Sequence, residues 1–206
     1  MAEPRILDTE ALKGLAHPLR VALLDALSTY GPATASKLAD RLGESSGATS
    51  YHLRQLEKNG LVREVKGRGS GRERWWERVP GGIVLRGYDF PPESVERAAS
   101  DMILSEWLRN QRQIVNDYLS RGESLLSREW FEAGIMDITN LRLTLDQLRR
   151  LNDELEALVK PYVELSRAQS EPGARPVQLQ INGIPIVDGE PIPRPADVGG
   201  ADENSR

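Results

Sequence analysis

Hydrophobic residues in the first sixty positions recur every three or four residues, which is the spacing of amphipathic helices. The pattern predicts four short helices, over residues 8–15, 18–30, 34–42 and 46–59. Pro18 suits a first helical turn, and Thr34 is a good N-terminal cap for the third helix. Gly43 and Gly60 follow the third and fourth helices, where glycine commonly ends a helix.

After Gly60 the pattern changes to two short β-prone runs, at 61–65 and 72–79. A turn rich in glycine and arginine, residues 67–71, separates them, so the sequence predicts a hairpin with a basic tip. Trp75 and Trp76 are adjacent in the second run and therefore face opposite sides. One of the two is expected to pack on the domain core.

The order of these elements is more specific than any one of them. A four-residue turn, Gly43-Glu44-Ser45-Ser46, joins two short amphipathic helices, which is typical of a helix-turn-helix. A hairpin directly after the second of these helices makes the unit a winged helix-turn-helix. We expect a mainly α fold with small β, with this winged helix-turn-helix domain over residues 1–82.

The rest of the chain is expected to form a helical region over residues 92–187. The hydrophobic pattern predicts a long helix at 92–119 and a second helix from Thr144 to about Arg167, with short strands at 135–143 and 177–181. The apolar stripes of these helices indicate a core and a dimer surface. A ligand pocket could form between the long helices and these strands. The tail at 188–206 has the composition of a disordered segment.

Charge is distributed unevenly along the chain. The 206 residues carry 27 Lys and Arg against 31 Asp and Glu, a net charge of −4. Residues 1–80 nevertheless carry a net charge of +3, and residues 49–78 hold eight basic and four acidic side chains. This local basic concentration is typical of a part that binds a polyanion.

Several function classes find no support in the sequence. There is no cysteine and there are two histidines, which leaves no thiolate metal site, and no metal or other cofactor is expected. No convergent acid–base or nucleophilic set is recognisable, so no catalytic residue is assigned and an enzyme is not expected. Without a signal peptide or an apolar run of about 20 residues, we expect a cytoplasmic protein with no membrane partner.

Candidate DNA contacts lie on the helix at 46–59 and on the hairpin. In a helix-turn-helix the second helix enters the major groove, and the phosphates are met by basic side chains. The candidates are Ser46, Thr49, Ser50, Tyr51, His52 and Arg54 on the helix, and Arg68, Arg72 and Arg74 on the hairpin. The alternative for each polar side chain is simple solvation, and for His52 a half-buried position at the core edge.

The motifs GLAHPLRVALLDAL, ASKLADRLGESSGATSYHLRQLEKNGLV and GRGSGRERWWERV together resemble the ArsR-type winged-helix repressors. The most specific part is Ser-x-His-Leu-Arg-x-Leu at 50–56, followed by Asn-Gly-Leu-Val at 59–62. The resemblance implies a dimeric DNA-binding regulator with a recognition helix at 46–59 and a wing at 62–79. Many members sense metals through cysteines in the helix before the turn, which here holds neither thiol nor histidine. The chain therefore looks more like the larger, non-metal branch.

The function expected from these observations is sequence-specific transcriptional regulation. We expect a homodimer, acting as a repressor on a pseudo-palindromic operator in double-stranded DNA, with an unidentified small-molecule effector as a further partner. The alternative is a protein-interaction module that uses the winged helix as a scaffold.

Overall fold

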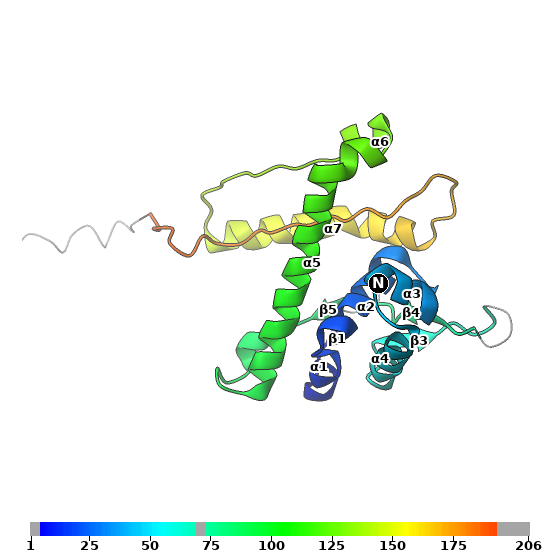
Figure 1. The fold of residues 1–206 in the computed structure, drawn as a ribbon. Coiled ribbons are helices and arrows are strands. Elements are labelled where there is room, and N and C mark those ends of the chain that lie inside the picture. Colours follow the sequence, from blue (N-terminus) through cyan, green and yellow to red (C-terminus); the bar gives the residue numbers. More distant parts are fainter. Residues whose placement is uncertain (1–4, 69–72, 193–206) are drawn as a thin grey trace, which may run out of the picture. The chain divides into compact units, whose positions relative to one another are not determined.

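The structure is a computed structural model that describes residues 5–68 and 73–192 (Figure 1). Its internal contacts divide the chain into two compact units. The first comprises Met1–Thr139 and Ser170–Gln178, and the second Asn140–Gln169 and Leu179–Arg206. Each unit is described by itself. The fold is mainly helical with a few short strands, and the fold class expected from the sequence is confirmed.

The four predicted N-terminal helices are all present, close to the expected bounds. They are α1 (Thr9–Leu15), α2 (Pro18–Tyr30), α3 (Ala35–Leu42) and α4 (Ser46–Lys58). Each starts at a side chain that accepts a hydrogen bond from the first-turn backbone: Asp8, His17, Thr34 and Ser45 respectively. These caps satisfy backbone N–H groups that have no partner inside the helix.

The predicted hairpin is formed by β3 (Val62–Glu64) and β4 (Trp75–Arg78), which pair antiparallel. A third strand, β2 (Ala33–Thr34), pairs with the other edge of β4, so the strand order is β2-β4-β3. Residues 69–72, which include part of the predicted basic tip, lie outside the described residues.

A second, two-stranded sheet was not predicted. Here β1 (Arg5–Ile6) pairs in parallel with β5 (Ile83–Val84). Strands of two residues are too short to produce a hydrophobic period, and their pairing depends on residues far apart in the sequence.

The core of the first unit is built around α2, which contacts α3, α4, α5 and β4. The helical spacing of Leu19, Ala22, Leu23, Ala26 and Leu27 predicts a single apolar stripe on α2. This prediction is partly wrong, because Leu19 and Ala22 are half-buried, whereas Val21 and Leu24 are almost completely buried. The reason is that α2 is covered from several directions, which a single stripe does not describe. Trp76 is the tryptophan that enters this core, at 2% exposure.

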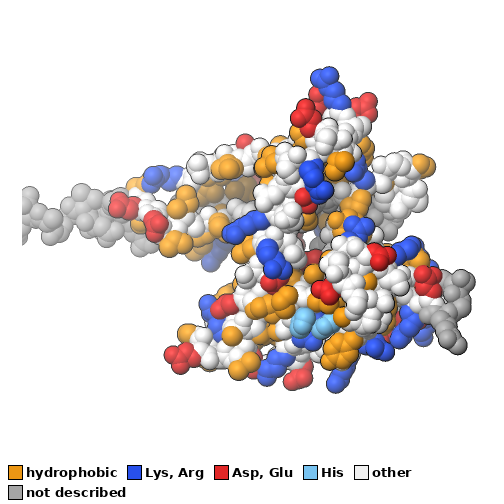
Figure 2. Space-filling view, viewed as in Figure 1, with side chains coloured by type: hydrophobic (Ala, Val, Ile, Leu, Met, Phe, Trp, Pro, Cys, Tyr) orange, Lys and Arg blue, Asp and Glu red, His pale blue; other side chains and the backbone are white. Residues whose placement is uncertain are grey.

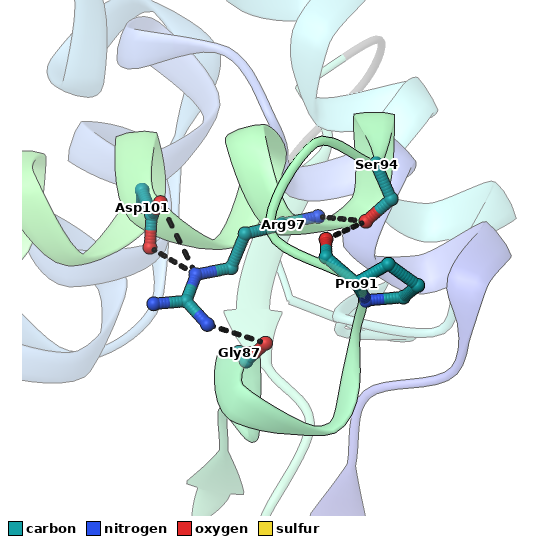
Figure 3. Close-up of polar contacts among 5 residues, drawn as sticks. All are labelled: Gly87, Pro91, Ser94, Arg97 and Asp101. Atoms are coloured by element: carbon teal, nitrogen blue, oxygen red, sulfur yellow. Dashed lines mark hydrogen bonds and ion pairs between the residues drawn. The ribbon is translucent and has the colours of Figure 1, made fainter.

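The long helix α5 (Val95–Leu125) begins at a compact polar cluster (Figure 3). The Ser94 hydroxyl accepts a hydrogen bond from the Arg97 backbone N–H at 3.1 Å and donates to the Pro91 carbonyl at 2.7 Å. The Arg97 guanidinium binds Asp101 at 3.2 Å and reaches the carbonyl of Gly87, in the 3-10 turn η1 (Gly87–Asp89), at 3.4 Å. The cluster ties the connector to the first turns of α5.

Beyond this start, α5 is mostly exposed. It packs on α1 and α2, and its buried residues are Ala99, Ser100, Ile103 and Gly122. The short helix α6 (Arg128–Glu132), which was not predicted, is held by the Tyr118 hydroxyl donating to the Phe131 carbonyl at 2.7 Å. Because α1 and α2 pack on α5, the first unit continues past the expected domain boundary at 82–92.

The second unit contains α7 (Leu145–Arg167), which opens with the predicted capping box of Thr144 and Gln147. Pro161 lies inside this helix, and α7 has no buried residue.

The strands predicted at 135–143 and 177–181 are wrong, because neither segment pairs with another strand in the described part of the chain. The tail expected to be disordered, 188–206, lies outside the described residues from 193 onward.

Candidate nucleic-acid interface

The turn between α3 and α4 is short and well defined. Gly43 adopts a left-handed conformation, with φ of 69°, at the C-terminus of α3. The Glu44 N–H then donates to the Ala39 carbonyl at 2.9 Å, which closes the end of α3. At the next residue, the Ser45 side chain accepts from the Ala48 N–H at 3.2 Å and starts α4. Backbone groups at the end of α3 and at the start of α4 therefore find hydrogen-bond partners within the turn.

One face of α4 is buried against the core and the other is open. Thr49, Leu53 and Leu56 are fully buried on the inner face. Five of the six predicted helix contacts lie on the outer side, which we call the α4 outer face: Ser46, Ser50, Tyr51, His52 and Arg54. Ser46, Tyr51 and Arg54 are exposed, and Ser50 and His52 are half-buried. Thr49 does not belong to this face, since it lies one turn before Leu53 and has no exposed surface.

The two histidines meet beside the α4 outer face. Their ring centroids are 4.3 Å apart, and Tyr51 packs edge-on against His52 at 5.1 Å. Figure 2 shows both histidines, in pale blue, at the surface with Lys and Arg side chains nearby. Burial, His17 and Arg20 lower the pKa of His52, and Glu44 opposes them. His52 is thus the half-buried residue at the core edge that the alternative interpretation described, and its ring is still partly open to solvent.

The wing arginines differ in how free their charges are. Arg74 is bound by Glu64, with an Nε–Oε2 distance of 2.8 Å, and lies 3.9 Å from Glu57. Its hydrogen bonds lower the pKa of Glu64. Arg68 is exposed and stacks over the Trp75 ring at 4.2 Å. Arg72 lies outside the described residues. Arg68 therefore offers an accessible charge, whereas the charge of Arg74 is already compensated.

Two basic residues on α3 extend this surface and were not singled out from the sequence. Lys37 lies over the Trp75 ring at 4.7 Å, and Arg41 lies over the Tyr30 ring at 3.5 Å. With Arg68 they line an open hollow of about 750 Å³ between α3 and the base of the wing. Their spacing of four residues places both on one side of α3, and this spacing was the available sequence signal.

A family model described as a helix-turn-helix domain matches residues 15–65. The match covers α2 to the start of the wing, and it supports the helix-turn-helix that the sequence predicts there. Helix-turn-helix domains bind DNA through their second helix, so the match supports a DNA-binding transcriptional regulator. No curated protein matches the chain.

Two solved structures are similar to parts of the chain. One is a crystal structure of an ArsR family transcriptional regulator, which is 26% identical, covers 52% of this chain and 88% of its own, and has a TM-score of 0.29. The other is a transcriptional regulator from Thermotoga maritima, 14% identical over 78% of this chain and 88% of its own, with a TM-score of 0.30. At TM-scores this low, neither structure bears on the function of this chain.

Within 5–68 and 73–192, no three His, Asp or Glu side chains gather closely enough to hold a metal ion. Over the same stretches, every helix is too short or too polar to cross a bilayer.

Proposed function

We propose that this chain is a sequence-specific DNA-binding transcriptional regulator that acts as a homodimer on a pseudo-palindromic operator. The α4 outer face enters the major groove, and the wing meets the backbone or the minor groove. The observation that carries the proposal is the pairing of a polar, small-residue helix face with accessible basic side chains on α3 and on the wing, within a helix-turn-helix domain.

Each outer-face residue has a chemical role in this proposal. Arg54 can donate two hydrogen bonds to a guanine or one to a phosphate, and Ser50 can donate or accept at a base edge. Ser46 and Gly47 are small, so the helix N-terminus can lie deep in the groove. Tyr51 and His52 lie at the flank, within reach of the sugar–phosphate backbone. Thr49 is not among the proposed DNA contacts, because it is buried.

The basic side chains outside α4 contribute affinity rather than sequence preference, because phosphates carry no sequence information. Arg68 on the wing and Lys37 and Arg41 on α3 supply three charges on this side of the domain. Arg74 contributes less than the sequence suggested, since Glu64 and Glu57 already compensate it.

The homodimer is supported by apolar side chains that the chain itself leaves open. Large hydrophobic residues are more than 40% exposed on both long helices: Leu104, Leu108, Leu119 and Leu125 on α5, and Leu145, Leu158, Tyr162 and Leu165 on α7. Exposed apolar patches of this kind mark interaction surfaces. Residues 92–187 are therefore proposed to dimerise the protein and to respond to an effector, while residues 1–82 bind DNA.

Selection of genomic DNA fragments on the purified chain, followed by sequencing, tests the proposal. We expect enriched fragments to share an inverted repeat, and light scattering to give twice the 22.9 kDa chain mass. Arg54→Ala should cost about 1–3 kcal/mol and relax the preference at one position of the repeat. Arg112→Ala, an exposed change on α5, is the matched control and should bind normally.

Two results would contradict the proposal. Fragments bound without any shared motif would remove sequence specificity, and a mass of one chain would remove the dimer. A reporter gene placed behind a selected fragment distinguishes repression, the expected outcome, from activation. Capture of no DNA at all would favour the protein-interaction alternative.

A further inference from the structure

A small cavity of about 250 Å³ opens between α2, β4, β5 and α5, away from the α4 outer face. Trp107 and Ile114 of α5 and Ile83 of β5 give it an apolar side. Asp25 of α2 and Arg78 of β4 add two opposite charges. The volume is slightly below the range of about 300–1,000 Å³ usual for drug-sized ligands, so it suits a small metabolite.

Arg78 forms no ion pair in the described part of the chain, although Asp25 lies close enough for the two charges to interact. Arg78 donates from Nη1 to the Ser28 hydroxyl at 3.2 Å and from Nη2 to the Gly81 carbonyl at 3.1 Å, both of which are neutral groups. Its Nε–H is buried and has no hydrogen-bond partner. A partly desolvated guanidinium without a hydrogen-bonded anion is unfavourable, and its planar donors match a carboxylate. The site therefore favours a ligand that carries a carboxylate.

The negative charge is also incompletely matched. One carboxylate oxygen of Asp25 accepts a hydrogen bond from the Asn110 amide at 2.6 Å. Burial raises the pKa of Asp25, while the Asn110 hydrogen bond, the charge of Arg78 and a hydrogen bond from Trp107 oppose that rise. A carboxylate can accept roughly four hydrogen bonds, so Asp25 keeps capacity for a further donor. An ammonium group would supply both the donor and the missing charge.

We propose that this cavity binds a small α-amino acid with an apolar side chain. The ligand carboxylate binds Arg78, its ammonium binds Asp25, and its side chain lies against Trp107 and Ile114. The decisive feature is that Asp25 and Arg78 face one cavity without forming an ion pair, so the two charges stay available for a ligand that carries both complements.

Such a ligand would act as the effector of the regulator, and this part rests on the proposed function. Arg78 lies on the strand that carries the wing, Asp25 lies on α2 of the helix-turn-helix domain, and Asn110 lies on α5. A molecule bound to all three elements would fix the wing strand relative to α2 and α5. DNA affinity should therefore change when the cavity is filled.

Calorimetric titration of the full chain with L-leucine and L-phenylalanine tests the site directly. Each is compared with its two single-charge analogues: 4-methylpentanoate and 3-methylbutylamine for leucine, 3-phenylpropionate and 2-phenylethylamine for phenylalanine. We expect at least one amino acid to bind and to raise the melting temperature. Both of its analogues should bind at least roughly tenfold more weakly than the amino acid. Absence of binding by both amino acids at millimolar concentration, or equal binding by the analogues, would overturn the proposal.

Substitutions then locate the site. Arg78→Gln and Asp25→Asn should each abolish amino-acid binding, and Arg112→Gln, an exposed change on α5, should leave it unchanged. Melting curves without ligand show whether each variant is folded, and the analogue comparison needs no variant. Unchanged binding by folded Arg78→Gln would also overturn the proposal.

Gel-shift assays with and without the amino acid separate this proposal from the proposed function. Amino-acid binding in a chain that binds no DNA would refute the regulator and keep the site. DNA binding without amino-acid binding would refute the proposed site and keep the proposed regulator function.

Discussion

Arg54 and Arg74 were both predicted to bind DNA, but the structure places them in different electrostatic settings. Arg54 is exposed on the α4 outer face and forms no ion pair among the described residues. Arg74 binds Glu64 at 2.8 Å through Nε and lies 3.9 Å from Glu57. A phosphate that approaches Arg74 must compete with these two carboxylates. We therefore expect Arg54→Ala and Arg74→Ala to change DNA binding differently.

The size of the difference follows from counterion release. Each phosphate neutralised by a free cation adds about −0.9 to the slope of log affinity against log salt. Raising the salt from about 50 to about 200 mM should therefore weaken DNA binding by Arg54→Ala about 3.5-fold less than it weakens binding by the unmodified protein. Arg74→Ala removes one positive charge that two nearby carboxylates already offset, so the slope should stay close to that of the unmodified protein.

Fluorescence anisotropy with a labelled duplex, measured at several salt concentrations, gives the slopes. Arg112→Ala on α5 serves as the matched control, since it removes an exposed arginine away from the α4 outer face. An unchanged slope in Arg54→Ala would refute the placement of α4 on the DNA. A slope change in Arg74→Ala as large as that in Arg54→Ala would refute the argument that ion pairing withholds its charge.

Three further predictions concern the helix-turn-helix itself, and each is read from the free energy of unfolding in urea. Thr49→Val should stabilise the protein by about 1 kcal/mol, because it removes a buried hydroxyl that has no hydrogen-bond partner. Thr34→Val should destabilise it by about 1 kcal/mol, because the Thr34 hydroxyl caps α3. Equal changes in the free energy of unfolding for the two variants would contradict this reasoning. Gly43→Ala should cost about 1–2 kcal/mol from its left-handed backbone alone, since a Cβ there meets no atom, and Gly43→Asn should cost less; a neutral Gly43→Ala would count against the turn geometry. Burial and neighbouring positive groups lower the pKa of His52, so below about pH 6.5 the unfolded chain takes up a proton that the folded chain resists. The free energy of unfolding should therefore fall as the pH is lowered through this value, and it should fall less in His52→Gln. The same pH dependence in the variant and the unmodified protein would contradict this.

The winged helix-turn-helix was readable from the sequence because its signals are local. Caps such as Thr34 and Ser45, and the glycine at 43, act within one turn of the chain. The hydrophobic spacing of α4 alone separated Leu53 and Leu56 from the outer positions. The order of the helices and the hairpin then indicated the motif.

The errors arose where the outcome depends on distant partners. The segments at 135–143 and 177–181 have apolar residues suited to strands, but a strand forms only with a partner to pair with, and none is found for either in the described residues. In α2 the neighbours on several sides, rather than the helical period, decided which residues are buried.

The sequence by itself determined the helices, their caps, the hairpin and which face of α4 is apolar, because backbone conformation and side-chain periodicity are set within a few residues. Only the tertiary structure decided which charges are free. It paired Arg74 with Glu64, it placed Lys37 and Arg41 beside the wing, and it brought Asp25 and Arg78 to one cavity. Electrostatic availability depends on distances between side chains far apart in the chain, and those distances exist only after folding.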